Sequence, residues 1–201
     1  FNSDVSSWDV SRVTTMQAMF RDASDFNSDV SSWDVSSVTN MQEMFYEASS
    51  FNRTLCWDLN EALSFASMFD GCSGSLDASC VTSASPLLKL KVAAWCDNSS
   101  SAEAMHGHIS VWDTSGVTDM SSLFGKKWDG DAWVEAYCST PDTFDEDLSA
   151  WDVSSVESMN SMFNWASSFN SDVSAWDVSR VETMDFMFSE ASSFNSDVSA
   201  W

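Results

Sequence analysis

Aspartates recur at fixed positions in a unit of 25 residues, and they are the side chains whose type and spacing could do chemistry. One copy of the unit, residues 26–50, reads FNSDVSSWDVSSVTNMQEMFYEASS. If neighbouring copies stack, carboxylates at equal positions lie about 5 Å apart and repel one another unless a cation bridges them. Calcium suits such oxygen ligands. The predicted calcium ladder is the ninth residue of four copies: Asp9, Asp34, Asp152 and Asp177.

A local role for these aspartates needs no metal. The ninth position lies two residues before a serine that is suited to begin a helix, so its carboxylate can accept backbone hydrogen bonds in the turn. The sequence also lacks the glycine-rich nonapeptide of calcium-binding repeats. We therefore favour the local role and expect no cofactor, with calcium as the alternative.

A second group of candidates lies where the repeat is interrupted, between Gly125 and Thr143. Insertions in repeat arrays form loops on one face, where a partner can reach them. This insertion contains basic and aromatic side chains that could contact a carbohydrate or a protein: Lys126, Lys127, Trp128, Trp133 and Tyr137. The alternative, which we favour, is that the insertion braces an imperfect junction between repeats.

The five cysteines are confined to the irregular middle of the chain. Their spacings match no close zinc-binding pattern, so we expect disulfides and an oxidising compartment. The pairing Cys96–Cys138 is the first prediction and Cys72–Cys80 the second, and one thiol is left over. Cys72 could instead be a buried free cysteine, because it stands at a small apolar position of the repeat.

Two Asn-x-Ser/Thr sequences mark candidate glycosylation sites, at Asn52 and at Asn98, if a eukaryote secretes the protein. Such tripeptides are also expected by chance in a chain this rich in serine. Asn98 is the better candidate because we expect it to lie in a loop.

Composition and missing motifs argue against several functions. The chain has 31 acidic and 8 basic residues, a net charge of −23, which argues against binding of nucleic acid. No nucleophile elbow, glycine-rich phosphate loop or His-Glu-x-x-His motif is present, so we do not expect an enzyme. No apolar run of about 18 residues is present, so we expect no membrane span in this segment. Because the chain starts and ends within a repeat, we expect it to be part of a longer protein.

The period of the repeat predicts the elements that hold these residues. Apolar residues at positions 13, 16, 19, 20 and 23 of the unit are typical of a short helix, and positions 3–6 favour a short strand. Stacked copies would align these strands in a narrow parallel sheet with right-handed connections. We therefore predict an α/β repeat solenoid of about eight coils, with regular coils in residues 1–74 and 144–201 and degenerate coils in residues 75–143. A further helix is expected from Pro86 to Trp95.

The segment WDVSSVTNMQEMF, followed by ASSFN, resembles the repeat of BspA-like surface proteins, a group also known as the mycoplasma-lipoprotein-type repeat of unknown function. The resemblance is strongest outside residues 75–143. It implies a leucine-rich-repeat-like solenoid that lies outside the cell and is often linked to adhesion. It supplies no catalytic residues.

Together these features predict a non-enzymatic structural or adhesive segment that is extracellular or on the cell surface, such as a rod, a spacer or a fibre building block. The expected partners are neighbouring copies, other surface proteins or glycans. The alternatives are a carbohydrate- or protein-binding module that uses the aromatic insertion, and a calcium-stabilised surface module.

Overall fold

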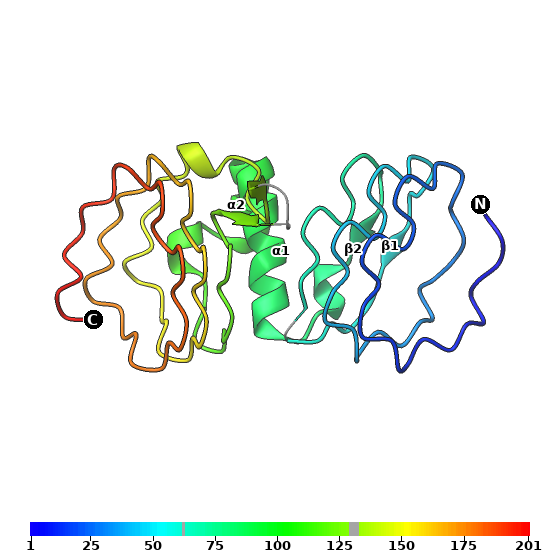
Figure 1. The fold of residues 1–201 in the computed structure, drawn as a ribbon, viewed down its shortest axis with the longest axis horizontal. Coiled ribbons are helices and arrows are strands. Elements are labelled where there is room, and N and C mark those ends of the chain that lie inside the picture. Colours follow the sequence, from blue (N-terminus) through cyan, green and yellow to red (C-terminus); the bar gives the residue numbers. More distant parts are fainter. Residues whose placement is uncertain (62, 129–132) are drawn as a thin grey trace. The chain divides into compact units, whose positions relative to one another are not determined.

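The computed structural model describes residues 1–61, 63–128 and 133–201, and the side chains of these residues except those of 127, 128 and 133–135. The chain divides into two compact units, unit 1 (residues 1–87) and unit 2 (residues 88–201). Turns and extended backbone make up most of each unit (Figure 1). The boundary between the units falls within helix α1, Ala84–Asp97.

Regular secondary structure is short and lies in the middle of the sequence. Unit 1 contains a parallel pair of two-residue strands followed by a 3-10 helix: β1 (Thr54–Leu55), β2 (Ser75–Leu76) and η1 (Ala78–Cys80). Unit 2 contains, after α1, a second helix, two 3-10 helices and one antiparallel strand pair: α2 (Ser99–His106), η2 (Ile109–Val111), β3 (Lys126–Trp128), β4 (Trp133–Glu135) and η3 (Pro141–Thr143).

The predicted fold class is wrong, because the structure is not a solenoid of eight coils that each carry a strand and a helix. Among the described residues, α-helix occurs only in α1 and α2, which lie outside the regular repeats. The positions expected to be helical form consecutive tight turns, in which the Met19 N–H donates to the Met16 carbonyl at 3.2 Å. Ala18 and Asp22 have φ of 53° and 57°, the left-handed region that a right-handed helix excludes.

Alternate N–H groups of these turns donate to the next repeat, and this explains why no helix forms. The Met16 N–H donates to the Asn40 carbonyl at 2.7 Å, and the Phe20 N–H donates to the Met44 carbonyl at 2.8 Å. A helix needs every N–H for the carbonyl four residues earlier, so the two patterns exclude each other. The same bonds recur in unit 2: Met159 to Thr183, Ser161 to Asp185, Phe163 to Met187 and Trp165 to Ser189.

Stacked aromatic rings fill the core of each unit. The Phe20 ring lies 3.8 Å from the Phe26 ring and 5.6 Å from the Phe45 ring, measured between centroids. Trp33 is buried, and its Nε1 donates to the Val5 carbonyl of the preceding repeat at 3.1 Å. Equivalent close ring pairs recur along the chain: Phe45–Phe51, Phe124–Phe144, Phe163–Phe169 and Phe188–Phe194. Each repeat is therefore buried by its neighbours.

Helix α1 buries an apolar face in unit 2 through Leu88, Val92 and Trp95. The helix predicted from Pro86 to Trp95 is thus present, and it extends two residues further at each end. Its place in the sequence is the region that we predicted to be degenerate, where the repeat pattern is lost.

Candidate functional site

The repeated aspartates lie in tight Asp-x-Ser turns. The Oδ1 of Asp9 accepts hydrogen bonds from the N–H of Ser11 at 3.2 Å and from its hydroxyl at 2.7 Å. The Oδ1 of Asp152 accepts from the N–H and the hydroxyl of Ser154 at 3.0 and 2.6 Å. The backbone bond recurs in the other two predicted calcium ligands, from Ser36 to Asp34 and from Ser179 to Asp177. One carboxylate oxygen of each aspartate is therefore used locally, in the role favoured above.

These hydrogen bonds lower the pKa of the aspartates below the ordinary value of 3.8. At Asp34 the hydroxyl and the N–H of Ser36 lower the pKa, whereas desolvation and the neighbouring Asp9 carboxylate raise it. The contribution of Asp9 is the smallest of these. At Asp34 and Asp152 the local hydrogen bonds therefore outweigh the repulsion from neighbouring carboxylates, so the pKa is lowered overall.

Acid should destabilise this fold. Because the folded pKa values lie below 3.8, the turn hydrogen bonds contribute stability above about pH 4, and this stability is lost as the pH falls through the folded values. We expect the melting temperature to decrease between about pH 5 and about pH 2.5, and to decrease less in a Ser11→Ala, Ser154→Ala variant, which lacks two of the hydroxyl bonds. Equal decreases in the two proteins would contradict this interpretation.

Within the described residues, no group of three or more His, Cys, Asp or Glu side chains could hold a metal ion. Calcium binding therefore stays a prediction that needs its own test. We expect calcium and sodium chlorides at equal ionic strength to raise the melting temperature equally, because both screen an acidic surface. A rise with calcium alone, reversed by EDTA, would instead identify the aspartate ladder as a metal site.

The two sequon asparagines are exposed, and each accepts a hydrogen bond through its Oδ1. Asn52 accepts from the Nδ2 of Asn27 at 3.0 Å. Asn98 is the N-cap of α2 and accepts from the Ser101 N–H at 3.0 Å, so it begins a helix rather than lying in the expected loop. Glycosylation of either residue stays a prediction.

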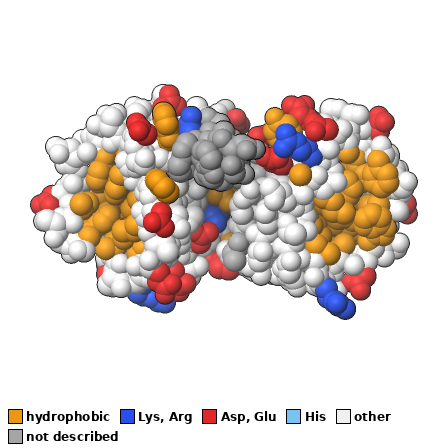
Figure 2. Space-filling view, in the orientation of Figure 1, with side chains coloured by type: hydrophobic (Ala, Val, Ile, Leu, Met, Phe, Trp, Pro, Cys, Tyr) orange, Lys and Arg blue, Asp and Glu red, His pale blue; other side chains and the backbone are white. Residues whose placement is uncertain are grey.

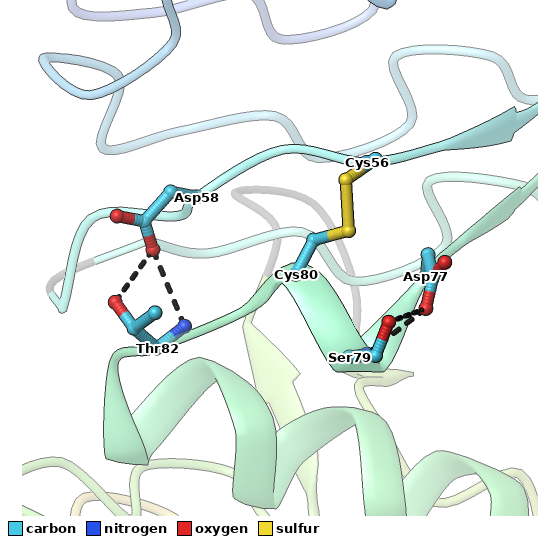
Figure 3. The surroundings of a disulfide bond; sticks show 6 residues. All are labelled: Cys56, Asp58, Asp77, Ser79, Cys80 and Thr82. Carbon is cyan, nitrogen blue, oxygen red and sulfur yellow. Dashed lines mark hydrogen bonds between the residues drawn. A yellow bond between two sulfur atoms is a disulfide. The ribbon is translucent and has the colours of Figure 1, made fainter.

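Two disulfides join segments that are distant in sequence. Cys96, in α1, is bonded to Cys138, which follows β4; this is the first of the two predicted pairings. The second predicted pairing, Cys72–Cys80, is wrong because Cys80 is bonded to Cys56 (Figure 3). The parallel pairing of β1 with β2 explains this, since Cys56 directly follows β1 and Cys80 lies shortly after β2.

The Cys56–Cys80 disulfide lies beside a departure from the Asp-x-Ser pattern. Asp58 accepts hydrogen bonds from the N–H of Thr82 at 3.2 Å and from its hydroxyl at 2.7 Å (Figure 3). This aspartate thus bonds the next segment of the chain instead of its own turn. The bond and the disulfide hold the same two segments together.

Cys72 is the one cysteine left as a free thiol. It is partly buried, and this burial raises the pKa of the thiol, although a hydrogen bond with the Gly74 backbone opposes the shift. A thiol with a raised pKa is a poor nucleophile near neutral pH. Cys72 is therefore a free cysteine, as in the alternative given above, but it is only partly buried.

The aromatic insertion forms the antiparallel pair β3–β4, in which Trp128 and Trp133 are backbone partners. The side chains of Lys127, Trp128 and Trp133 lie outside the described residues, so the structure does not test their predicted contact with a ligand. The described backbone of the insertion therefore includes an antiparallel strand pair, and its surface chemistry stays a prediction.

Two other predicted ligand residues of the insertion have described side chains. The Lys126 Nζ lies 5.3 Å from the centroid of the Trp165 ring. Tyr137 is only 8% exposed, and the Lys89 Nζ lies 5.4 Å from its ring centroid. Tyr137 is thus part of the core of unit 2, and its ring is not available for stacking on a ligand.

Comparison with known families classifies the repeat. The model of a family described as Mycoplasma protein of unknown function, DUF285, matches residues 1–79 and 97–201. The chain belongs to this family. Searches of curated proteins and of solved structures gave no match. Membership of DUF285 therefore classifies the repeat and assigns no activity.

This DUF285 protein departs from the family model at residues 80–96, a stretch that includes most of α1. Here Lys89 is only 2% exposed, and its Nζ lies 2.5 Å from the Oδ2 of Asp119. Burial raises the pKa of Asp119, but the Lys89 ammonium and hydrogen bonds with Ser121 outweigh it and lower the pKa overall. The sequence did not predict this pair, because Lys89 and Asp119 are 30 residues apart and no repeat pattern relates them.

Acidic side chains line a series of neighbouring hollows on unit 2 of the DUF285 protein. The hollow beside Trp95 has a volume of about 400 Å³ and is bordered by Asp97, Asp145 and Glu146. A second hollow, of about 340 Å³, is bordered by Asp145, Glu146 and Asp172. A third, of about 290 Å³, is also bordered by Asp172. Such a lining repels anions, which agrees with the argument against nucleic acid.

No helix in residues 1–61, 63–128 and 133–201 is long and apolar enough to cross a membrane.

Proposed function

We propose that this chain is a non-enzymatic extracellular repeat segment with a structural or adhesive role, of the kind found in BspA-like surface proteins. The observation that carries the proposal is the repetition of one interface. From repeat to repeat, the same backbone hydrogen bonds and the same ring stacking recur, as in Met16–Asn40 and Met159–Thr183. An array of this kind gains its stability from nearest neighbours, and it lengthens by adding repeats. That property suits a spacer or a fibre component.

Two further features support an extracellular location. The disulfides Cys56–Cys80 and Cys96–Cys138 are of the kind that persists in oxidising compartments. The net charge of −23 and the exposed Asp-x-Ser turns favour a hydrated surface that does not associate nonspecifically. Neighbouring copies, surface proteins and glycans are the partners consistent with this role.

Labelling of intact cells tests the proposal. An antibody raised against residues 1–201 should label unpermeabilised cells of the producing organism, and brief treatment of those cells with protease should remove the label. The purified chain, added to the same cells, separates an adhesive role from a spacer role, since only an adhesive segment should bind saturably. Labelling that requires permeabilisation would contradict an extracellular location.

A further inference from the structure

Lys89 is a lysine in the core of unit 2. Figure 2 shows Lys and Arg side chains, in blue, on the surface of the molecule, where such charged residues usually lie. Lys89, in α1, is by contrast only 2% exposed. Its Nζ lies 2.5 Å from the Oδ2 of Asp119 and 5.4 Å from the centroid of the buried Tyr137 ring. The amine is therefore held against a carboxyl group and is shielded from water.

This pair is costly to bury as two ions. Removal of an ammonium and a carboxylate from water can cost more free energy than their mutual attraction returns. Condensation of the two groups to an amide removes both charges from the interior and leaves one neutral bond. Reacting groups that a fold holds in contact behave as if their concentration were about 10⁵ M or more. The fold therefore supplies the proximity that condensation needs.

The two carboxyl oxygens of Asp119 lie in different environments, which suits attack by an amine. Oδ2 contacts the Lys89 Nζ, and Oδ1 accepts a hydrogen bond from the backbone N–H of Ser121 at 2.9 Å. A fixed N–H at this distance stabilises the negative charge that develops on a carbonyl oxygen during attack. Oδ2 is thus placed to leave as water, and Oδ1 is placed to remain as the amide oxygen.

We propose that Lys89 and Asp119 form an intramolecular isopeptide bond. A proton first passes from the Lys89 ammonium to Oδ2, which converts the ion pair into an amine and a carboxylic acid. The Nζ then attacks the Cγ of Asp119, so that the Nζ–Cγ bond forms and the Cγ–Oδ2 bond breaks. Oδ2 takes a second proton from the nitrogen and leaves as one water molecule. No atom is oxidised or reduced, and no other reactant is needed.

The reaction should be slow and should follow folding. The pKa of Asp119 is lowered overall, because the Lys89 ammonium and hydrogen bonds outweigh the effect of burial. The ion pair is therefore the favoured form before reaction, and only its minor neutral form can condense. An unfolded chain does not hold the two side chains together, so it should not form the bond.

The isopeptide bond joins α1 to the repeated part of unit 2. Asp119 pairs with Ser158 of the next repeat in a parallel bridge, so the bond connects the helix to the stacked repeats. The disulfide Cys96–Cys138 also starts in α1, so the helix is tied to unit 2 at two places. An amide, unlike a disulfide, is not broken by thiol exchange. The bond lies within one chain, so it goes beyond the proposed structural or adhesive role and does not depend on it.

The intact mass of the full chain, measured after storage in the folded state and then reduction and denaturation, tests the proposal. It should lie below the mass calculated from the sequence by one water molecule. Lys89→Arg keeps the positive charge but replaces the amine by a guanidinium that stays protonated, so this chain should keep its full mass. Lys91→Arg, in the same helix, is the matched control and should lose the water like the unmodified chain.

Peptide mapping locates the loss of water. After reduction and digestion with protease, one branched fragment should contain both Lys89 and Asp119, and a chain kept in denaturant should not yield it. An unmodified chain that keeps its full mass would overturn the proposal, as would a loss of water located elsewhere or shared equally by the Lys89→Arg and Lys91→Arg chains. If Lys89→Arg fails to fold, the branched fragment of the unmodified chain still decides, by its presence or its absence.

Discussion

Replacing Phe163 by Ala should lower the free energy of unfolding by about 3–5 kcal/mol, as expected for truncation of a buried aromatic side chain. Phe163 is 0% exposed, and its ring stacks on Phe169 at 3.9 Å and on Phe124 and Phe188 at 5.6 Å. The truncation therefore removes contacts with the preceding and the following repeat together. Chemical denaturation of the variant and the unmodified chain measures the difference.

Phe186→Ala is the matched control for Phe163→Ala. Phe186 belongs to the next repeat but is 60% exposed, so the same truncation there should change the free energy of unfolding by less than about 1 kcal/mol. Similar losses in the two variants would show that the inward-facing positions of the repeat have been assigned incorrectly.

Removing the Cys96–Cys138 disulfide should have the second large effect. The bond closes a loop with a sequence separation of 42, for which the loop-closure entropy predicts a loss of about 4 kcal/mol. The loss should be confined to unit 2, because both cysteines lie in residues 88–201. A Cys96→Ala, Cys138→Ala double variant, followed by thermal and chemical denaturation, provides the measurement.

Cys72→Ala is the control, because it removes a cysteine without removing a disulfide. Cys72 forms no disulfide and is only partly buried, so its replacement should cost about 1 kcal/mol or less. Reduction of the unmodified chain breaks Cys56–Cys80 as well as Cys96–Cys138, so it should destabilise unit 1 in addition to unit 2. If the double variant were as stable as the Cys72→Ala chain, the disulfide would not be a structural element of unit 2.

The repeated apolar positions of the sequence indicated which residues are buried, but not which backbone conformation they adopt. Val30, Trp33 and Met41 are all buried, as their repeated apolar positions suggest. The predicted helix failed because a spacing of three and four residues also suits consecutive tight turns. Those turns need left-handed conformations at residues such as Ala18 and Glu43, whose φ values are 53° and 56°. Neither residue is a glycine, so the amino-acid composition gave no indication of left-handed conformations at these positions.

The candidate sites were predictable to the extent that they are local. The Asp-x-Ser turn depends on residues two apart, and spacing alone suggested that Asp9 bonds its own turn. The Cys56–Cys80 bond depends on the register of β1 against β2, and the Lys89–Asp119 pair depends on where α1 lies in unit 2. Both are set by contacts between segments distant in sequence, for which the interrupted middle of the chain has no periodic pattern.

Hydrogen exchange of individual amides tests most directly the claim that identical contacts between neighbouring repeats hold this array together. The N–H groups of Met41, Phe45 and Phe163, which donate to the next repeat, should exchange slowly. In a chain made of residues 1–201 alone, the N–H groups of Met184 and Phe188, at equivalent positions of the repeat 169–193, have no backbone acceptor among the described residues and should exchange quickly. Fast exchange throughout both sets would contradict the account, because the repeats would then not be held by their neighbours.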